Sequence, residues 1–257
     1  MRLRWWVVIW LLIGVGVFGG TAGAGKPKPS PDMIAKGKVL YERMCLYCHG
    51  AEGRGDGPAA FFLGAYSAPR PRDFVKGGFK FRSTPSGELP TDQDLFRTLT
   101  RGIIGVMPSF AGVTEDERWQ IIAYVKSFNP EFTQPLVQPI PLRSQPILPT
   151  AESIERGRAV YETFACRRCH GADGRGDGTA VLSGDLKDSW GLPIAPADLA
   201  RPGSFKNGSS VRDIVRVLLT GLDGTPMPSY APQFADGEDD AWHLANYILS
   251  LSANDGR

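Results

Sequence analysis

The chain has 257 residues, and its 31 glycines and 21 prolines form a larger share than is usual in globular proteins, which disfavours a long helical bundle or a regular barrel. An apolar content of 42%, with six tryptophans and thirteen phenylalanines, excludes a disordered chain, and the length allows one or two domains. The formal net charge is +2, residues 1–24 carry both of these charges, and the neutral remainder argues against nucleic acid as a partner.

The chain begins with a segment typical of export signals. Two arginines within the first four residues precede an uncharged apolar run, and Ala22 and Ala24 form the small-x-small pattern of a signal-peptidase site. We expect residues 1–24 to be either a signal peptide cut after Ala24 or an uncleaved membrane anchor, because the charge-free residues 5–25 are long enough to cross a bilayer. Both alternatives predict that the rest of the chain lies outside the cytoplasm, in the periplasm or on the outer face of the cytoplasmic membrane.

The remainder of the chain consists of one unit that occurs twice. Four sequence blocks recur in the same order: 34–41 matches 154–161, 48–57 matches 169–178, 107–110 matches 227–230, and Trp119 with Tyr124 matches Trp242 with Tyr247. This tandem duplication predicts a domain over 25–129, a linker over 130–152 and a second domain over 153–257.

Each copy predicts an all-α domain in which a helix, a glycine-rich loop, a short helix, a further loop and a last helix follow one another. Leu95, Phe96 and Leu99 have helical spacing, and Thr114 with Glu117 forms a capping box before an apolar helix face. The expected helices begin near Pro31, at Asp92 and behind Thr114 in the first copy, and near Ser153, at Val211 and behind Asp236 in the second.

The linker is rich in proline. Six prolines between Pro130 and Pro149 rule out a helix or a central strand and predict an extended, polyproline-like segment. Because this segment also contains six leucine, isoleucine and valine residues, we expect it to lie along a domain surface.

The two halves of the chain differ in charge. Residues 25–129 hold 15 basic and 11 acidic side chains, whereas residues 130–257 hold 12 basic and 16 acidic ones. The halves could dock against each other or present different faces to different partners, and a chance imbalance is the third interpretation.

All four cysteines fall in two Cys-x-x-Cys-His strings, 45–49 and 166–170. In an exported protein this string is the attachment signature of c-type haem, because two thiols at this spacing reach the two vinyl groups of one porphyrin edge and the adjacent histidine is held beneath the iron. A disulfide does not explain the histidine, and a zinc site needs further ligands that the sequence lacks. We therefore expect two covalently bound c-type haems, one on Cys45, Cys48 and His49 and one on Cys166, Cys169 and His170.

Two methionines have the context expected of a sixth iron ligand. Met107 and Met227 follow His49 and His170 by 58 and 57 residues, each is followed by Pro-Ser-aromatic, and each lies on a loop between two expected helices. Ligation by histidine and methionine raises the haem potential and leaves no vacant iron site. The expected iron ligands are therefore His49 with Met107 and His170 with Met227.

The other methionines and the third histidine have ordinary explanations. Met33 and Met44 lie on or beside the first expected helix, where packing in the core is the simpler role. His243 follows a tryptophan on the last helix and is expected at the surface; replacement of Met227 by His243 at the iron is the alternative.

Together these features resemble tandem class I cytochrome c domains over residues 32–129 and 152–257. The resemblance implies an all-α fold and a diheme electron carrier with no catalytic side chain. Its partners would be redox proteins of a respiratory chain, and it could be the cytochrome subunit of a membrane oxidoreductase. A diheme peroxidase with one openable haem is the enzymatic alternative, and the paired methionines and the shortage of histidines argue against it. A sensor of small gaseous ligands is a third alternative, and the chain contains nothing that resembles an output module.

The resemblance also implies several structural residues. On the first helix of each copy a glycine and a tyrosine should cross the last helix closely, namely Gly37 with Tyr41 and Gly157 with Tyr161, opposite the aromatic residues Trp119, Tyr124, Trp242 and Tyr247. A proline carbonyl should hold each axial histidine, and Pro71 and Pro196 are the expected residues. The second copy carries an unmatched insertion over 182–193, which is either a tolerated loop or a surface for a partner.

Overall fold

The computed structural model describes residues 27–63, 70–234 and 237–254, and these ranges are helical with no strand. The all-α prediction is confirmed. The first copy contains α1 (Pro31–Met44), α2 (Leu46–His49), α3 (Pro58–Leu63), α4 (Asp92–Arg101), α5 (Glu115–Ser127) and the 3₁₀ turn η1 (Pro130–Thr133). The second contains α6 (Ala151–Thr163), α7 (Arg167–His170), α8 (Thr179–Leu182), η2 (Pro202–Ser204), α9 (Val211–Thr220), η3 (Ala231–Phe234), α10 (Asp239–Ser250) and η4 (Leu251–Asn254).

The expected signal or anchor over residues 1–24 lies outside the described residues, as does Asp236, the expected cap of the last helix. Among the helices that the structure describes, none has the length and apolar character needed to cross a membrane.

Side-chain caps determine where the helices begin. The Thr114 hydroxyl accepts the amide proton of Glu117, whose carboxylate in turn accepts from the Thr114 amide, so the predicted capping box opens α5. The bounds of α4 and α9 also agree with the sequence prediction. The helix α6 starts two residues before the expected Ser153, because the Thr150 hydroxyl accepts from the Ser153 amide and is the true cap.

In each copy the first and last helices cross at a glycine. A Cβ on Gly37 would lie 2.0 Å from the carbonyl oxygen of Gln120, and a Cβ on Gly157 would lie 2.0 Å from that of His243. Only a residue without a side chain permits α1 to approach α5, and α6 to approach α10, this closely.

Aromatic side chains pack beside both crossings. The ring centroids of Tyr41 and Tyr124 are 5.2 Å apart, and those of Tyr161 and Tyr247 are 5.4 Å apart, as the resemblance implied. Trp119 packs elsewhere and stacks on Phe96 of α4 at 4.3 Å.

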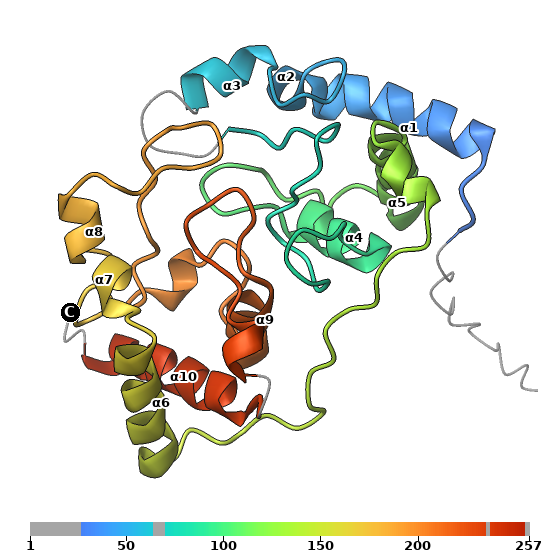
Figure 1. Ribbon diagram of the computed structural model, residues 1–257. Coiled ribbons are helices and arrows are strands. Elements are labelled where there is room, and N and C mark those ends of the chain that lie inside the picture. The colour runs from blue at the N-terminus through green and yellow to red at the C-terminus, as the bar shows by residue number, and fades with distance from the viewer. Residues whose placement is uncertain (1–26, 64–69, 235–236, 255–257) are drawn as a thin grey trace, which may run out of the picture.

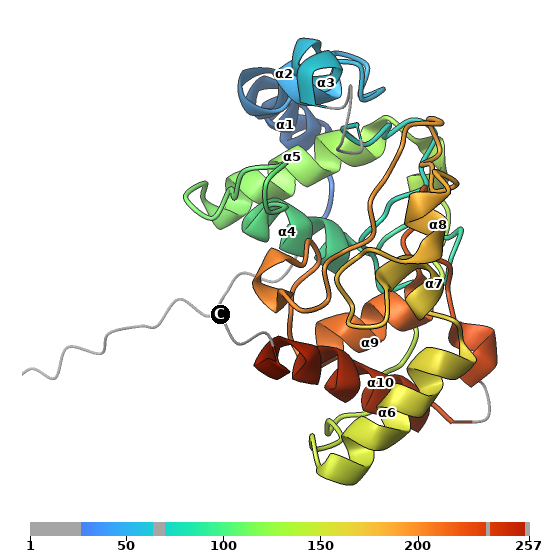
Figure 2. The same ribbon diagram turned by 90° about the vertical axis from the view of Figure 1, so that its left-hand side faces the viewer.

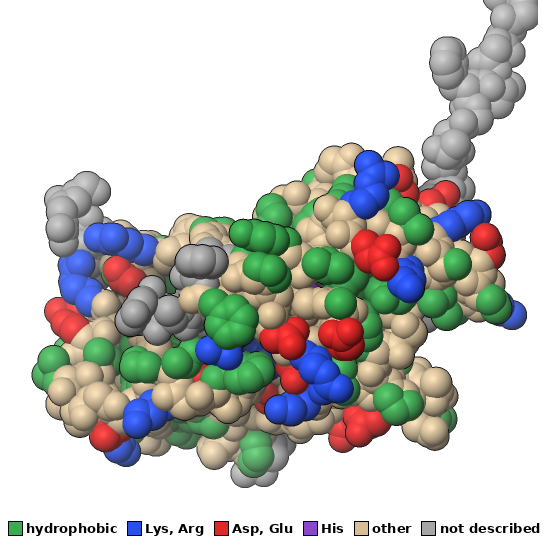
Figure 3. Space-filling model, turned by 90° about the horizontal axis from the view of Figure 1, so that it is seen from above, with side chains coloured by type: hydrophobic (Ala, Val, Ile, Leu, Met, Phe, Trp, Pro, Cys, Tyr) green, Lys and Arg blue, Asp and Glu red, His purple; other side chains and the backbone are tan. Residues whose placement is uncertain are grey.

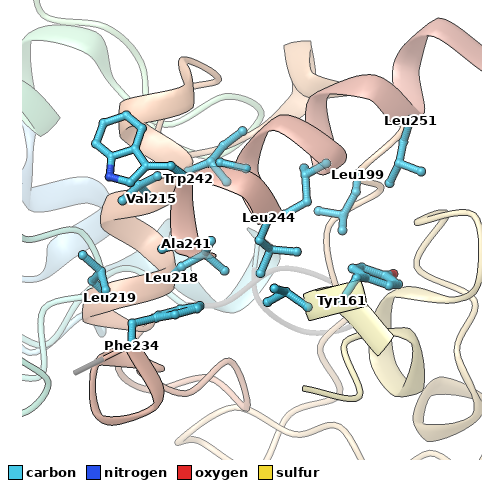
Figure 4. Close-up of a cluster of buried hydrophobic side chains, with 14 residues drawn as sticks. Tyr161, Leu199, Val215, Leu218, Leu219, Phe234, Ala241, Trp242, Leu244 and Leu251 are labelled. Carbon is cyan, nitrogen blue, oxygen red and sulfur yellow. The ribbon is translucent and has the colours of Figure 1, made fainter. Parts of the chain in front are cut away.

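Each copy has its own hydrophobic core. In the second copy, side chains from α9 and α10 point toward one another and toward Tyr161 of α6 (Figure 4). Figures 1 and 2 show the first copy, α1 to α5, stacked above the second, with α6 and α10 at the end of the molecule farthest from α1.

The linker departs from the extended prediction at its start, where Pro130–Thr133 form a 3₁₀ turn capped by the Asn129 side chain. Between this turn and the start of α6 at Ala151 the linker has no regular structure and lies on both domains. The Ile140 amide donates to the Ser83 carbonyl at 2.8 Å, and the buried Asn246 amide group donates to the carbonyls of Ile147 and Leu148. The prediction that the linker lies along a domain surface is therefore confirmed.

The oppositely charged halves dock through ion pairs. On α4, Arg97 and Arg101 lie 3.9 and 3.8 Å from the carboxylate of Asp213 on α9. The buried Arg82 of the first copy pairs with Asp223 of the second at 2.8 Å. Of the three interpretations of the charge imbalance, the described residues support docking between the copies.

The insertion over 182–193 contacts the first copy. The Trp190 ring lies under Arg70 and Lys76, with its centroid 5.3 and 5.6 Å from the two cationic groups. The buried Asp188 carboxylate accepts from the Trp190 and Leu192 amides and holds the loop in shape. This loop rises from α8 toward the first copy in Figure 1. The insertion is thus a surface for the neighbouring domain of the same chain.

Candidate functional site

Each Cys-x-x-Cys-His string forms a single helical turn. The His49 amide donates to the Cys45 carbonyl and the His170 amide to the Cys166 carbonyl, each at 2.9 Å. All four cysteines are free. Burial raises the pKa of the Cys45 thiol to about 12 and that of Cys166 to about 11.

The second copy has one more residue than the first between the buried tyrosine of its first helix and its Cys-x-x-Cys-His string. Five positions separate Tyr161 from Cys166, whereas four separate Tyr41 from Cys45. Ala165 absorbs the extra residue with a φ of 53°, the left-handed conformation that costs a residue with a Cβ about 1–2 kcal/mol. Despite this difference, the turn that follows is the same in both copies.

A backbone carbonyl orients each histidine ring. Nδ1 of His49 lies 3.3 Å from the carbonyl oxygen of Arg72, and Nδ1 of His170 lies 3.0 Å from that of Ala197. Because a carbonyl only accepts, Nδ1 carries the proton and Nε2 presents its lone pair, as a metal-binding imidazole requires. The expectation of a proline carbonyl is wrong by one residue: the acceptors follow the prolines directly.

The carbonyl of the expected proline, Pro71, does not point toward the histidine. Pro71 directs its carbonyl toward Gly55, where a Cβ would come within 2.2 Å of the oxygen. The carbonyl that faces His49 therefore belongs to Arg72. Burial lowers the pKa of His49 to about 4 and also lowers that of His170, so both imidazoles are neutral near pH 7.

The two methionine loops share a backbone bond at their base, although the Met107 amide donates to the Ile103 carbonyl and the Met227 amide to the Thr225 hydroxyl. In the first copy, the Ile103 amide donates to the Met107 carbonyl at 2.8 Å; in the second, the Leu222 amide donates to the Met227 carbonyl at 3.0 Å.

The residues after each methionine are bonded alike as well. The Phe110 amide donates to the Leu99 carbonyl, and the Tyr230 amide donates to the Leu218 carbonyl. The Ser109 and Ser229 hydroxyls each donate to a carbonyl in the last turn of the preceding helix. These shared bonds anchor the Met107 and Met227 loops to the preceding helix in the same way.

A large cavity in the first copy brings three of the expected residues together. Cys48, His49 and Met107 all line it, and Cys45 is buried in the core beside it. Its empty volume is about 1170 Å³ when the mouth that opens to solvent is included. The wall is otherwise mainly apolar and includes Phe74, Phe79, Phe81, Leu95, Leu99, Ile103, Val106, Ile121, Ile122 and Val125. In the second copy, Cys166 and Met227 pack against the same buried cluster.

His243 lies away from these groups. It is half-buried, and its Nδ1 is 2.8 Å from the Ser153 hydroxyl, which also accepts from Asn246. The expected free surface histidine is therefore a bonded one at the junction of α6 and α10.

Sequence reasoning missed four cationic side chains that line the cavity, namely Arg70, Arg72, Lys80 and Lys206. The available signal was the string Arg70-Pro71-Arg72, in which two arginines flank the proline that was expected to hold the histidine. Nothing local pointed to Lys206, which comes from the second copy.

Comparison with known families decides the identity of this arrangement. Residues 32–125 match the family described as cytochrome c oxidase, cbb3-type, subunit III, and residues 154–252 match the cytochrome c family. The protein is a tandem pair of cytochrome c domains. As such it is an electron-carrying diheme cytochrome with two covalently bound c-type haems.

Two known proteins are similar to this diheme cytochrome. A chain of the reducing HAO-like protein complex of Kuenenia stuttgartiensis is 39% identical, with a TM-score of 0.75, and the alignment covers 84% of this chain and 95% of that one. Cytochrome c55X of Paracoccus denitrificans (strain Pd 1222) is 36% identical over 84 residues, which are 33% of this chain and 61% of that relative's length.

The cavity suits a c-type haem on physical grounds. Its apolar wall matches a porphyrin face, its cations match carboxylate side chains, and its thiols and neutral imidazole match the covalent and axial bonds of the group. Among the described residues, no group of three histidine, cysteine or carboxylate side chains could hold a separate metal ion.

Proposed function

We propose that this cytochrome carries electrons between partners of a respiratory chain outside the cytoplasm, in the periplasm or at the outer face of the cytoplasmic membrane. The first haem would be held by Cys45, Cys48, His49 and Met107, and the second by Cys166, Cys169, His170 and Met227. The observation that supports this assignment best is the duplicated geometry, in which two oriented histidines and two similarly anchored methionine loops occur at matched positions.

The haems would supply a one-electron redox couple, and the chain's own residues would tune it. The carbonyls of Arg72 and Ala197 keep the proton on Nδ1 of each histidine and leave Nε2 for the iron. A methionine sulfur ligand would favour the reduced state, and the proposed role gives no side chain an acid–base task.

We propose three parts for the chain: residues 25–129 and 153–257 as the two domains and residues 130–152 as the linker. The preceding residues 1–24 would be the export signal or the anchor, with membrane attachment through residues 5–25. Each domain would offer one haem, so that electrons enter at one domain and leave at the other.

A redox enzyme is the partner class that the comparisons favour. One similar structure belongs to a complex named as HAO-like, and one matching family is described as an oxidase subunit. We therefore propose that the protein exchanges electrons with a larger oxidoreductase, as a subunit or as a mobile donor. The face viewed in Figure 3 interleaves acidic and basic side chains with apolar ones, which suits short-lived contacts.

An optical redox titration of the haem-loaded protein tests the proposal. We expect two haems per chain, both low-spin, and the weak far-red ferric band that reports a methionine–iron bond at the strength of two such bonds. A band of half strength together with one high-spin haem would contradict double methionine ligation, and peroxide turnover would then be the activity to assay.

A further inference from the structure

The cations that line the first domain's cavity are only partly balanced by acidic side chains: Asp223, Asp188 and Asp73 act on Arg72 from behind the wall, but none of the three lines the cavity itself. Arg70, Arg72, Lys80 and Lys206 line the cavity, and none of the other described residues in its wall is acidic. Cations in an apolar wall are costly unless an anion is present. The cluster therefore indicates an anionic ligand group in this part of the cavity.

Unsatisfied bonding supports the same conclusion. Nε of Arg70 is buried with no hydrogen-bond partner among the described residues. Burial, together with repulsion by Arg72 and Lys206, lowers the pKa of Lys80 to about 8, although Asp188 opposes the shift. The cations are thus close enough to repel one another.

The tandem duplication shows that the cluster is specific to the first domain. Arg70 and Arg72 flank Pro71, whereas alanines flank Pro196 at the matching place in the second copy. The Phe-Lys pair that ends with Lys80 recurs as Phe205-Lys206. Both lysines of this repeated pair line the same cavity, so the second domain contributes a side chain to the site of the first.

We propose that Arg70, Arg72, Lys80 and Lys206 bind the two propionate carboxylates of the first haem, and that Lys206 makes this site a shared one, complete only when the domains are docked. This assignment rests on the proposed position of the haem between His49 and Met107. Charge-assisted bonds to carboxylates are the strong class of hydrogen bond, and the orphaned Arg70 supplies a donor for one.

The site also predicts which haem has the higher potential. Cations near the propionates offset their negative charge and favour the reduced iron, and the second copy has alanines where Arg70 and Arg72 stand. The first haem should therefore be reduced before the second.

The test is a redox titration of full-length, haem-loaded variants at Lys206. We expect Lys206→Met to lower the potential of one haem, so that its reduced-to-oxidised ratio at a fixed potential falls severalfold, while the other haem is unchanged. Lys206→Arg should restore the potential, because it keeps the charge. Lys187→Met, at an exposed lysine of the second domain that does not line the cavity, should shift neither haem.

Repeating the Lys206 substitutions in a Met107→His protein shows which haem is affected, because Met107→His separates the potential of the first haem from that of the second. If Lys206→Met leaves both potentials unchanged, or if Lys206→Arg behaves like Lys206→Met, the shared site is wrong. If Lys206→Met prevents haem attachment, Lys206→Gln is titrated in its place. A wild-type protein without two methionine-ligated haems would instead overturn the proposed function.

Discussion

The guanidinium group of Arg82 lies 2.8 Å from the carboxylate of Asp223, across the interface between the two domains, and the Arg82 side chain is fully buried. It also donates to the carbonyl of Thr220, the last residue of α9. Asp223 accepts further bonds from the Ser86 hydroxyl and the Gly87 amide. Because Asp223 lies in the loop that leads to Met227, a residue of the first domain positions the methionine loop of the second.

Replacing Arg82 by methionine should therefore destabilise the protein and disturb the second haem. The change leaves Asp223 without its buried partner, and we expect the free energy of unfolding to fall by about 3–5 kcal/mol. The far-red band should lose intensity from one haem. Guanidinium unfolding and the optical spectrum measure the two effects. As a control, Arg158→Met removes the exposed pair with Glu155 and should leave the unfolding free energy nearly unchanged, because solvent screens such a pair.

The helix crossings predict a strong effect of single methyl groups. Gly37→Ala and Gly157→Ala each place a Cβ 2.0 Å from a backbone oxygen of the facing helix, so we expect losses of about 3 kcal/mol in unfolding free energy. Gly112→Ala is the matched control, because nothing lies within 4 Å of its Cβ position. If all three variants were equally stable, the close crossing would be wrong.

Tyr41 predicts a pH-dependent stability. Burial, with a smaller contribution from Cys45, raises its pKa above the ordinary value of 10.0, and its hydroxyl donates to the Gly50 carbonyl at 2.7 Å. Above pH 10 the unfolded chain releases this proton while the folded chain retains it, so stability falls as pH rises. Tyr41→Phe should cost about 1 kcal/mol at neutral pH through the lost bond.

The difference between wild type and Tyr41→Phe should then shrink as pH rises above 10, because only the wild type carries the ionisable group. Unfolding curves at neutral and alkaline pH measure it. A difference that stays constant with pH would contradict the buried, protonated hydroxyl.

The methionines predict separable potentials. Met107→His would replace the proposed sulfur ligand by an imidazole, so the potential of the first haem should fall by a large margin and the far-red band should lose half its strength. Met227→His should do the same to the second haem. If both potentials moved together in either variant, separate ligation of the two haems would be wrong.

Ala165 predicts a stabilising substitution. Its φ of 53° is unfavourable for a residue with a Cβ, and Ala165→Gly should raise the unfolding free energy by about 1 kcal/mol. Thermal unfolding of the haem-loaded protein measures the gain. A loss of stability would show that the flexibility of glycine in the unfolded chain outweighs the relief of strain.

Local signals predicted most of the fold. The Thr114–Glu117 box and the helical spacing of α4 each depend on neighbouring residues or on one helix face, whereas the glycines at the helix crossings were implied by the family resemblance. The haem strings were equally local, since one turn of helix holds both cysteines and the histidine. Neighbouring residues in the sequence are sufficient to determine these local features.

Features that depend on distant surfaces were not predicted. Arg82 and Lys206 acquire their roles only when residues more than a hundred positions apart come together, and no pattern within either copy encodes that pairing. The histidine acceptors were missed by one residue because the direction of a carbonyl follows backbone torsion rather than residue type.

The bonded linker affects the rate of electron exchange between the two domains. It is bonded to the first domain through Ile140 and Ser83 and to the second through Asn246, and the interface ion pairs lie beside it. The distance between the two cofactors is therefore set by the folded protein and needs no diffusive search by one domain for the other. Internal electron exchange should accordingly proceed at a rate independent of solvent viscosity, and only the encounter with external partners should slow in a thicker medium.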